Sequence, residues 1–275
     1  MELHVTKFTS RDQVAVILLS RPERHNAWTG RMHTELRHCL QIVDSDPGLR
    51  VVVIAGDPAG NAFCPGADGQ ALAGHADRGG YDPGTPPDLA NPGYGVRPEF
   101  DADFSYFLGL ETMSIAAING AVAGVGLALA CWCDIRFAAT GAKFTTAHGK
   151  LNLPAEYGLS WLLPRLIGLG NANDLLLSSR KFDSEEALRL GLVNYVKPHG
   201  TVIDHALNYA DTVVKDVSPH SLRTTKRQLA IDTINLNPAD SVNDAGRRLD
   251  QMMTESDYRE AARAFGSKQP PRWGS

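Results

Sequence analysis

The chain has few cysteines and no arrangement of them that suggests a metal site or a disulfide. Its four cysteines, Cys39, Cys64, Cys131 and Cys133, include no CxxC pair. A Cys-x-Cys pair in a helix would point its two thiols to different sides, which suits neither a bound metal nor a disulfide. We expect all four thiols to be reduced and structural, and we predict no metal and no cofactor.

The sequence also lacks an excess of positive charge. It has 27 Lys and Arg against 31 Asp and Glu, a net charge of -4. That balance favours neither a nucleic acid nor an anionic membrane surface as a partner. Residues 1–20 hold acidic and basic residues before a short apolar run, and they lack the order of regions that is typical of a signal peptide. We therefore expect a cytoplasmic protein with no nucleic-acid partner and no membrane partner.

No apolar run is long enough to span a membrane, and residues 115–139 come nearest. They read as a strand, a glycine-rich turn around Gly124, a buried helix and a second strand. The apolar part is interrupted and falls short of the ~20 residues that a spanning helix needs. A glycine-rich turn that enters a helix leaves backbone N–H groups unpaired at the positive end of the helix dipole. The turn could hold a negatively charged oxygen; alternatively, its glycines only allow close packing.

The N-terminal pattern indicates a parallel α/β arrangement. Residues 14–19 and 51–55 are apolar strands, and helical spacing over residues 28–43 follows a potential N-cap at Thr29. The second strand shows no alternation of apolar and polar residues, which is typical of a strand covered on both faces. A strand, helix, strand order of this kind favours parallel strands with right-handed crossovers.

A second glycine-containing loop, residues 56–68, follows the 51–55 strand and leads into a helix at Gln70. It resembles the turn at Gly124 in presenting backbone amides. Two such loops after two strands of one sheet could each direct one N–H at a single oxygen. That arrangement is an oxyanion hole, and the loss of one donor typically costs ~10²–10³ in rate.

Two regions lie outside this pattern. Residues 74–103 are dense in Gly, Pro and Asp without periodicity, which favours a mobile loop beside the site, with a solvated insert as the alternative. From residue 201 onward we predict helices over 201–216, 219–231 and 239–265. The predicted domains are therefore a core at 1–200 and a helical region at 201–275.

Several segments, in this order, resemble the crotonase superfamily, the enoyl-CoA hydratase/isomerase family. They are RPERHNA (21–27), AFCPGAD (62–68), IAAING (115–120), AGVG (123–126), CDIR (133–136) and SEEALRLGLV (184–193), followed by Ser218-Pro219 and the 223–229 helix. The resemblance implies a spiral of repeated ββα units with a C-terminal helical region that builds homotrimers or dimers of trimers. It also implies an acyl-CoA thioester substrate, so that coenzyme A is part of the substrate rather than a cofactor.

The resemblance assigns roles to particular positions. The oxyanion hole falls on the backbone N–H groups of Ala67 and Val125, where Val125 replaces the glycine of many members. From their positions in the sequence rather than from the resemblance, we expect Asp68 to fix its loop or cap a helix, Asp134 to satisfy backbone amides, and Glu111 to be exposed. The positions expected to bind coenzyme A or substrate are Arg24, Ala27, Asp68, Gly69, Gln70, Gly124 and Lys226, with Arg227 as a further candidate.

The acid and base groups depart from the family pattern. Hydratases of the familiar type use two glutamates, and the corresponding positions here are Ala128 and His148. The catalytic candidates that remain are His148 and Glu156, since other branches of the superfamily place a carboxylate near the latter.

Glu156 follows a proline turn and precedes the apolar helix 159–169. Partial desolvation there would raise its pKa towards neutrality, as a general acid or base requires. Its alternative role is a favourable interaction with the dipole of that helix. His148 could titrate near neutral pH and act with Glu156. The alternative role of His148 is structural, as a hydrogen-bonded residue at the end of a strand.

The function predicted from the family is that of an enoyl-CoA hydratase-type enzyme. An enoyl-CoA isomerase or a C–C bond hydrolase that uses one carboxylate fits the chemistry as well. A non-catalytic acyl-CoA-binding member is the alternative of another class.

Overall fold

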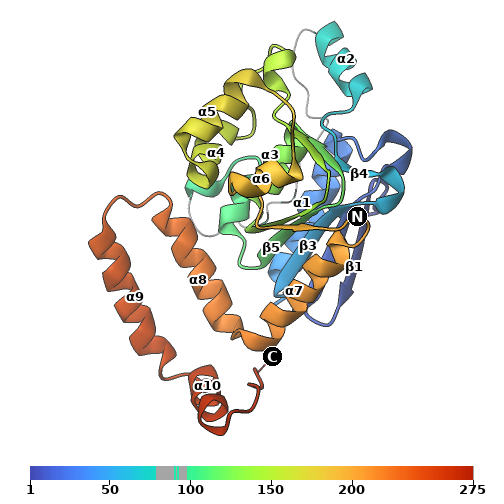
Figure 1. The fold of residues 1–275 in the computed structure, drawn as a ribbon. Coiled ribbons are helices and arrows are strands. Elements are labelled where there is room, and N and C mark those ends of the chain that lie inside the picture. Colours follow the sequence, from blue (N-terminus) through green and yellow to red (C-terminus); the bar gives the residue numbers. More distant parts are fainter. Residues whose placement is uncertain (79–89, 91, 93–97, 275) are drawn as a thin grey trace.

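The computed structural model describes residues 1–78, 90, 92 and 98–274, and Figure 1 shows how its elements are arranged around two sheets. The larger sheet has six strands in the order β1 (Thr6–Arg11), β2 (Val14–Leu19), β3 (Val51–Gly56), β5 (Met113–Ile118), β7 (Ile135–Ala139) and β10 (Tyr195–Lys197). The smaller has four, in the order β4 (Ala62–Cys64), β6 (Ala121–Ala123), β8 (Lys143–Thr145) and β9 (Phe182–Asp183).

From β3 to β8, successive strands alternate between the two sheets. The chain passes from β3 to β4, from β5 to β6 and from β7 to β8, so each pair contributes one strand to each sheet. Helices follow the first two pairs: α2 (Gly69–Arg78) after β4 and α3 (Val125–Trp132) after β6. This repetition is the spiral of ββα units that the resemblance predicted, and the α/β class is confirmed.

The larger sheet forms the centre of the hydrophobic core. Every residue of β3 and of β5 is buried, which confirms that strands without alternation are covered on both faces. From β2 to β10 all neighbours are parallel, and only β1 pairs antiparallel with β2. The carboxyl ends of the parallel strands therefore meet at one edge of the sheet.

The first helix matches the prediction closely. Helix α1 (Gly30–Ser45) begins after Thr29, whose hydroxyl oxygen accepts the N–H of Met32 at 3.2 Å. Its side chains at helical spacing, Met32, Leu36 and Leu40, are fully buried. The cap satisfies one of the N–H groups that a helix start leaves unpaired.

Three expectations about boundaries were wrong. Residues 74–78 belong to α2, while most of the predicted loop 74–103 lies outside the described residues. The loops carrying Ala67 and Val125 follow β4 and β6, two strands of the smaller sheet. These strands were not predicted from the sequence, because three residues are too few to show periodicity. The predicted 239–265 helix is two helices, α9 (Pro238–Met252) and α10 (Ser256–Ser267).

The break between α9 and α10 has a local cause. The Thr254 hydroxyl donates to the Gln251 carbonyl at 2.7 Å, and Glu255 adopts an extended conformation. Such side-chain to backbone bonds compete with helix continuation.

The remaining helices cover the core or leave it. Helix α4 (Leu159–Ile167) packs on α3 and on α5 (Leu169–Ser178), and α6 (Ser184–Arg189) contacts both β9 and β10. Helix α7 (Val202–Asp216) packs on the larger sheet (Figure 1). Helix α8 (Pro219–Asp232), α9 and α10 form what we call the C-terminal arm, in which α9 and α10 stand away from the sheets. Among the described helices, none combines the length and apolar character that a membrane crossing requires.

Replacing Thr29 by alanine removes the α1 cap without affecting the core. We expect Thr29→Ala to lower the free energy of unfolding by about 1 kcal/mol, the usual cost of a lost N-cap. Chemical denaturation followed by circular dichroism measures this. A Thr29→Ser variant keeps the hydroxyl and should retain most of the stability, and equal losses in both variants would contradict the capping role.

Candidate active site

The two amide-bearing loops follow neighbouring parallel strands. Strands β4 and β6 pair in parallel with Cys64 opposite Val122. Ala67 and Val125 each lie three residues beyond these partners, so the two loops leave the same edge of the sheet together. A Cβ built on Gly126 would lie 2.3 Å from the Cys64 carbonyl oxygen. Only glycine therefore allows the start of α3 to approach the end of β4 this closely.

The loop at Ala67 is held by a short bridge to Trp28. The Trp28 N–H donates to the Gly66 carbonyl at 2.8 Å, and the Asp68 N–H donates to the Trp28 carbonyl at 2.9 Å. In a parallel bridge these bonds use the neighbours of Ala67, so its own N–H faces away from Trp28. Within the described part of the chain, this N–H has no acceptor, and Ala67 is exposed.

The second amide lies at the start of α3. Gly124, the N-cap, has φ +50°, a conformation that favours glycine, and its N–H donates to the Thr145 carbonyl at 3.2 Å. Val125 is the first helical residue and has no positive φ, so a valine is accommodated without backbone strain. Its N–H has no partner within the helix, and no acceptor is found for it among the described residues.

The rest of α3 is apolar. Ala128, at one of the glutamate positions of familiar hydratases, is fully buried. At the other end of the helix, the Trp132 indole N–H donates to the Tyr157 carbonyl at 2.8 Å, and the Trp132 ring stacks on Trp161 at 5.9 Å. Gly158 has φ +76°, and a Cβ built on it would lie 3.0 Å from Cζ2 of the Trp132 indole. Helix α3 thereby anchors the turn that carries Glu156.

Glu156 itself is half-buried in that turn, just before α4. Its carbonyl accepts the N–H of Leu159 at 3.1 Å, while the N-cap of α4 is Gly158. The partly desolvated setting is the one in which a carboxyl group serves as an acid or base. Its catalytic role stays a prediction.

His148 begins a short 3-10 helix, η5 (His148–Lys150), directly after β8. The residue is 9% exposed. Its Nδ1 atom is buried without a hydrogen-bond partner among the described residues, and Ala147 before it has φ +61°. A buried, unpaired polar atom and a strained neighbour both cost free energy, and such costs concentrate at functional sites.

Asp68 fixes its loop and caps α2, as predicted. Its carboxylate is almost fully buried, accepts the N–H of Gln70 at 2.9 Å, and pairs with Arg21 at 3.0 Å and Arg24 at 3.2 Å. The hydrogen bond from Arg24, against an opposing effect of burial, lowers the pKa of Asp68 to about 2. Because Arg24 binds Asp68, its predicted contact with a coenzyme A phosphate depends on donors that this pair leaves unused.

The other predicted binding residues are spread around this loop or beyond it. Gly69 and Gln70 are exposed beside Ala67, and Ala27 is buried with its carbonyl accepting Arg21 at 2.8 Å. Lys226 is 8% exposed, and its ammonium donates to the Thr112 carbonyl and to Asp134, both at 2.7 Å. Lys226 therefore joins α8 to the core in this conformation, and its role in binding coenzyme A stays a prediction.

The two remaining carboxylates behave as expected. Asp134 accepts the backbone N–H of Ser114 at 2.6 Å. Glu111 has an exposed side chain that pairs with Arg227 at 2.7 Å. Neither forms part of the amide loops.

Three structural roles were missed from the sequence: the bridge from Trp28, the contact of Gly126 with Cys64, and the anchor at Trp132. A tryptophan that ends a helix of small residues was the available signal for the last. A cavity of about 750 Å³ formed by described residues contains none of the predicted catalytic residues.

Comparison with known proteins agrees with the geometry. The Enoyl-CoA hydratase/isomerase family profile matches residues 9–275. The chain is 33% identical over 261 residues to 1,2-epoxyphenylacetyl-CoA isomerase of Escherichia coli (strain K12), covering 94% of each chain. It is 34% identical over 268 residues to a probable enoyl-CoA hydratase of Mycobacterium tuberculosis (strain H37Rv), covering 95% of this chain and 89% of that one.

Solved structures give the same result. A probable enoyl-CoA hydratase/isomerase from Mycobacterium abscessus superposes with a TM-score of 0.86 at 31% identity, covering 98% of both chains. The chain belongs to the enoyl-CoA hydratase/isomerase family.

The contact at Gly126 makes a direct prediction. In Gly126→Ala the added methyl group would meet the backbone of Cys64, so the two amide loops must separate. We expect the free energy of unfolding to fall by about 1–3 kcal/mol and any acyl-CoA activity to drop. Gly246→Ala is the control, because a Cβ there meets nothing within 4 Å and alanine in a helix interior is favourable by up to about 1 kcal/mol. Denaturation curves compare them, and a Gly126→Ala protein as stable as wild type would contradict this packing.

The lowered pKa of Asp68 predicts a pH dependence of stability. In the unfolded chain the pKa of an aspartate is about 3.9. The stabilisation by ionised Asp68 is therefore complete above that pH and is lost as the pH falls towards about 2. We expect Asp68→Asn to lower the Tm at neutral pH and the difference from wild type to shrink as the pH falls from about 5 to about 2. Thermal melts across this range test it, and a difference independent of pH would argue against the ion pairs.

Proposed function

We propose that this protein is an acyl-CoA-processing enzyme of the enoyl-CoA hydratase type, which stabilises a thioester enolate between the backbone N–H groups of Ala67 and Val125. The observation that carries the proposal is the pairing of β4 with β6. It places two loops side by side at one sheet edge, and each loop presents an amide without an acceptor among the described residues.

The physical basis is electrostatic. Both donors are backbone groups fixed by neighbouring bonds, so they need not reorganise as negative charge develops on the thioester oxygen. Val125 also lies at the N-terminus of α3, where the helix dipole favours negative charge. These two effects support polarisation of a carbonyl whatever proton transfer follows.

Proton transfer is proposed for Glu156, assisted by His148. The fully buried Ala128 removes one carboxylate of the two-glutamate scheme, and His148 occupies the position of the other. The unpaired Nδ1 of His148 supports an active role, since a buried structural histidine normally has its ring nitrogens hydrogen-bonded.

Isomerisation is the second candidate. One carboxylate suffices to move a proton between two carbons, whereas addition of water conventionally uses two. A relative at 33% identity is named an isomerase, 1,2-epoxyphenylacetyl-CoA isomerase. Product analysis with enoyl-CoA and epoxyacyl-CoA substrates distinguishes hydration, isomerisation and C–C cleavage.

The C-terminal arm supports assembly into a homotrimer or a dimer of trimers. Large apolar side chains on or next to its helices are exposed in the single chain, among them Leu229 at 69% and Phe265 at 90%. Contact with other subunits would remove this surface from water. Sedimentation equilibrium of the full chain measures the assembly.

Substitution of Glu156 tests the chemistry. We expect Glu156→Gln to bind coenzyme A esters normally and to lower kcat by about 10²–10⁴, the usual contribution of a general acid or base. Glu2→Gln is the control, because the Glu2 side chain is 85% exposed. A Glu156→Gln enzyme that converts every active substrate at the wild-type rate would exclude this residue as the acid or base.

A structure with a bound acyl-CoA tests the oxyanion hole. We expect the thioester oxygen to lie about 2.7–3.1 Å from the nitrogen atoms of Ala67 and Val125. A thioester oxygen far from both amides would overturn the assignment. Binding without turnover across a broad acyl-CoA panel would instead indicate a binding protein.

A further inference from the structure

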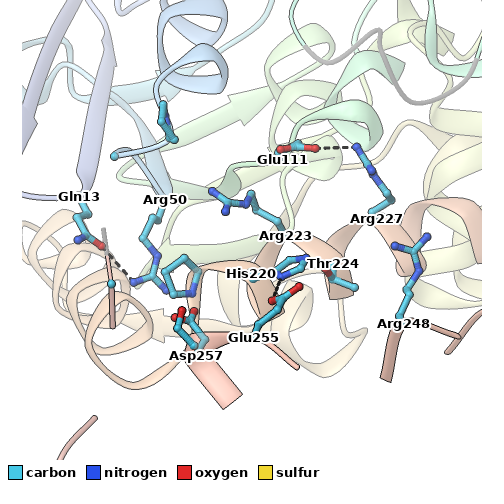
Figure 2. Close-up of a pocket in the computed structure, with 15 residues that line it drawn as sticks. Gln13, Arg50, Glu111, His220, Arg223, Thr224, Arg227, Arg248, Glu255 and Asp257 are labelled. Atoms are coloured by element: carbon cyan, nitrogen blue, oxygen red, sulfur yellow. Dashed lines mark hydrogen bonds and ion pairs between the residues drawn. The ribbon is translucent and has the colours of Figure 1, made fainter. Parts of the chain in front are cut away.

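A cavity of about 750 Å³ separates the C-terminal arm from the body of the protein (Figure 2), and we call it the arm cavity. On the body side it is lined by Gln13, Gly48, Arg50 and Glu111, which precede β2, β3 or β5. The first turns of α8 and the start of α10 line the other side. The arm cavity therefore lies at the amino ends of the parallel strands, whereas the amide loops follow carboxyl ends.

Most charged side chains around the arm cavity are paired. Arg227 contacts Glu111 at 2.7 Å, and Figure 2 also shows His220 bonded to Glu255. Arg248 is bonded to Asp244 beside the cavity. The two members of each pair neutralise each other. Three charged residues that line the cavity remain: Arg50, Arg223 and Asp257.

Arg50 is the first of these arginines. It is 6% exposed and donates to neutral acceptors, namely the Gln13 side-chain oxygen at 3.1 Å, the Val214 carbonyl at 2.7 Å and the Val217 carbonyl. Asp257 is the carboxylate whose charge acts on Arg50, yet it makes no ion pair with it within the described residues and accepts the Ser218 hydroxyl at 2.8 Å. The charge of Arg50 is therefore not matched by a direct partner.

Arg223 is the second of these arginines. It extends from α8 into the arm cavity on the side of Arg50 (Figure 2). It is half-buried and makes no hydrogen bond or ion pair with any described residue. Burial and the charge of Arg223 both lower the pKa of Arg50, which indicates that the two cations repel. A counter-ion between them would remove that repulsion.

The helix that carries Arg223 adds to the positive potential. Helix α8 begins in the cavity wall with Pro219 and His220. The N-terminus of a helix carries a partial positive charge that favours anions. Carboxylates also line the cavity, but Glu111 and Glu255 are paired with Arg227 and His220, so the positive potential is concentrated at Arg50, Arg223 and the start of α8.

We propose that the arm cavity binds a small molecule that carries a phosphate group, with Arg223 as the direct donor and Arg50 as the second positive charge. A phosphate group carries nearly two negative charges near neutral pH, which complements Arg50 and Arg223, two arginines that make no ion pair with a described residue. The planar guanidinium of Arg223 suits bidentate bonds to phosphate oxygens. The cavity volume falls in the range of small-molecule sites. The proposal is independent of the proposed catalytic function.

Calorimetric titration of inorganic phosphate into the full chain, at constant ionic strength held with chloride, tests the proposal. We expect Arg223→Gln to bind phosphate at least tenfold more weakly than wild type, because it loses charge-assisted hydrogen bonds. Arg247→Gln is the matched control on α9, since the Arg247 side chain is 70% exposed, and it should bind phosphate as wild type does.

A second variant acts without shortening an arginine. Gln13→Glu places a carboxylate where the Gln13 oxygen lies, 3.1 Å from Arg50, so the protein supplies its own counter-ion. We expect this variant to have a higher Tm than wild type in phosphate-free buffer and to show no phosphate-dependent rise in Tm.

Three results would overturn the proposal. One is equal phosphate affinity in wild type and Arg223→Gln when melts show both folded. Another is the absence of phosphate binding by the wild type, as would follow if a second copy of the chain covered the arm cavity. The third is loss of phosphate binding when saturating coenzyme A is added, which would place the phosphate in the substrate site.

Discussion

The parallel pairing of β4 with β6 is the constraint on which the candidate site depends. These strands have three residues each, so their own hydrogen bonds are few, and the contact between Gly126 and Cys64 holds their ends together. Each strand leads into a loop whose amide has no acceptor among the described residues. A shift of either strand by one residue would turn that amide away from the other.

Helix α3 transmits this constraint to the other end of the site. Its first residue supplies the Val125 amide, and its last, Trp132, holds the turn of Glu156 through the Tyr157 carbonyl. The buried guanidinium of Arg136 donates to the Cys131 and Cys133 carbonyls, and so satisfies the end of the helix. One short, fully buried helix thereby sets the positions of both the polarising group and the proposed acid or base.

The body also connects this helix to the C-terminal arm. Asp134 follows α3, and it accepts both the Ser114 N–H in β5 and the Lys226 ammonium in α8. Lys226 is buried in this pair while Asp134 is partly exposed, so removal of Asp134 would leave the buried ammonium without its counter-charge. The contact fixes where α8 crosses the body, and with it the wall of the arm cavity that carries Arg223.

The sequence by itself determined the parallel α/β class, the capped first helix, the buried central strands and both amide loops. Those features depend on local chemistry, such as glycine at a positive φ in Gly124 and unbroken apolar residues in β3. Even the absence of the usual glutamates, at Ala128 and His148, is plain without a structure.

Only the tertiary structure decided which groups meet. The short strands of the second sheet have no periodicity to detect, and the partners of Lys226, Arg24 and Arg50 lie 92, 44 and 164 residues away in the chain. Whether an arginine is neutralised depends on such distant neighbours. In the sequence, Arg223 is one basic residue among many. The fold places it in a cavity without a partner in the part of the chain that the structure describes, whereas the other arginines that line the cavity have acceptors.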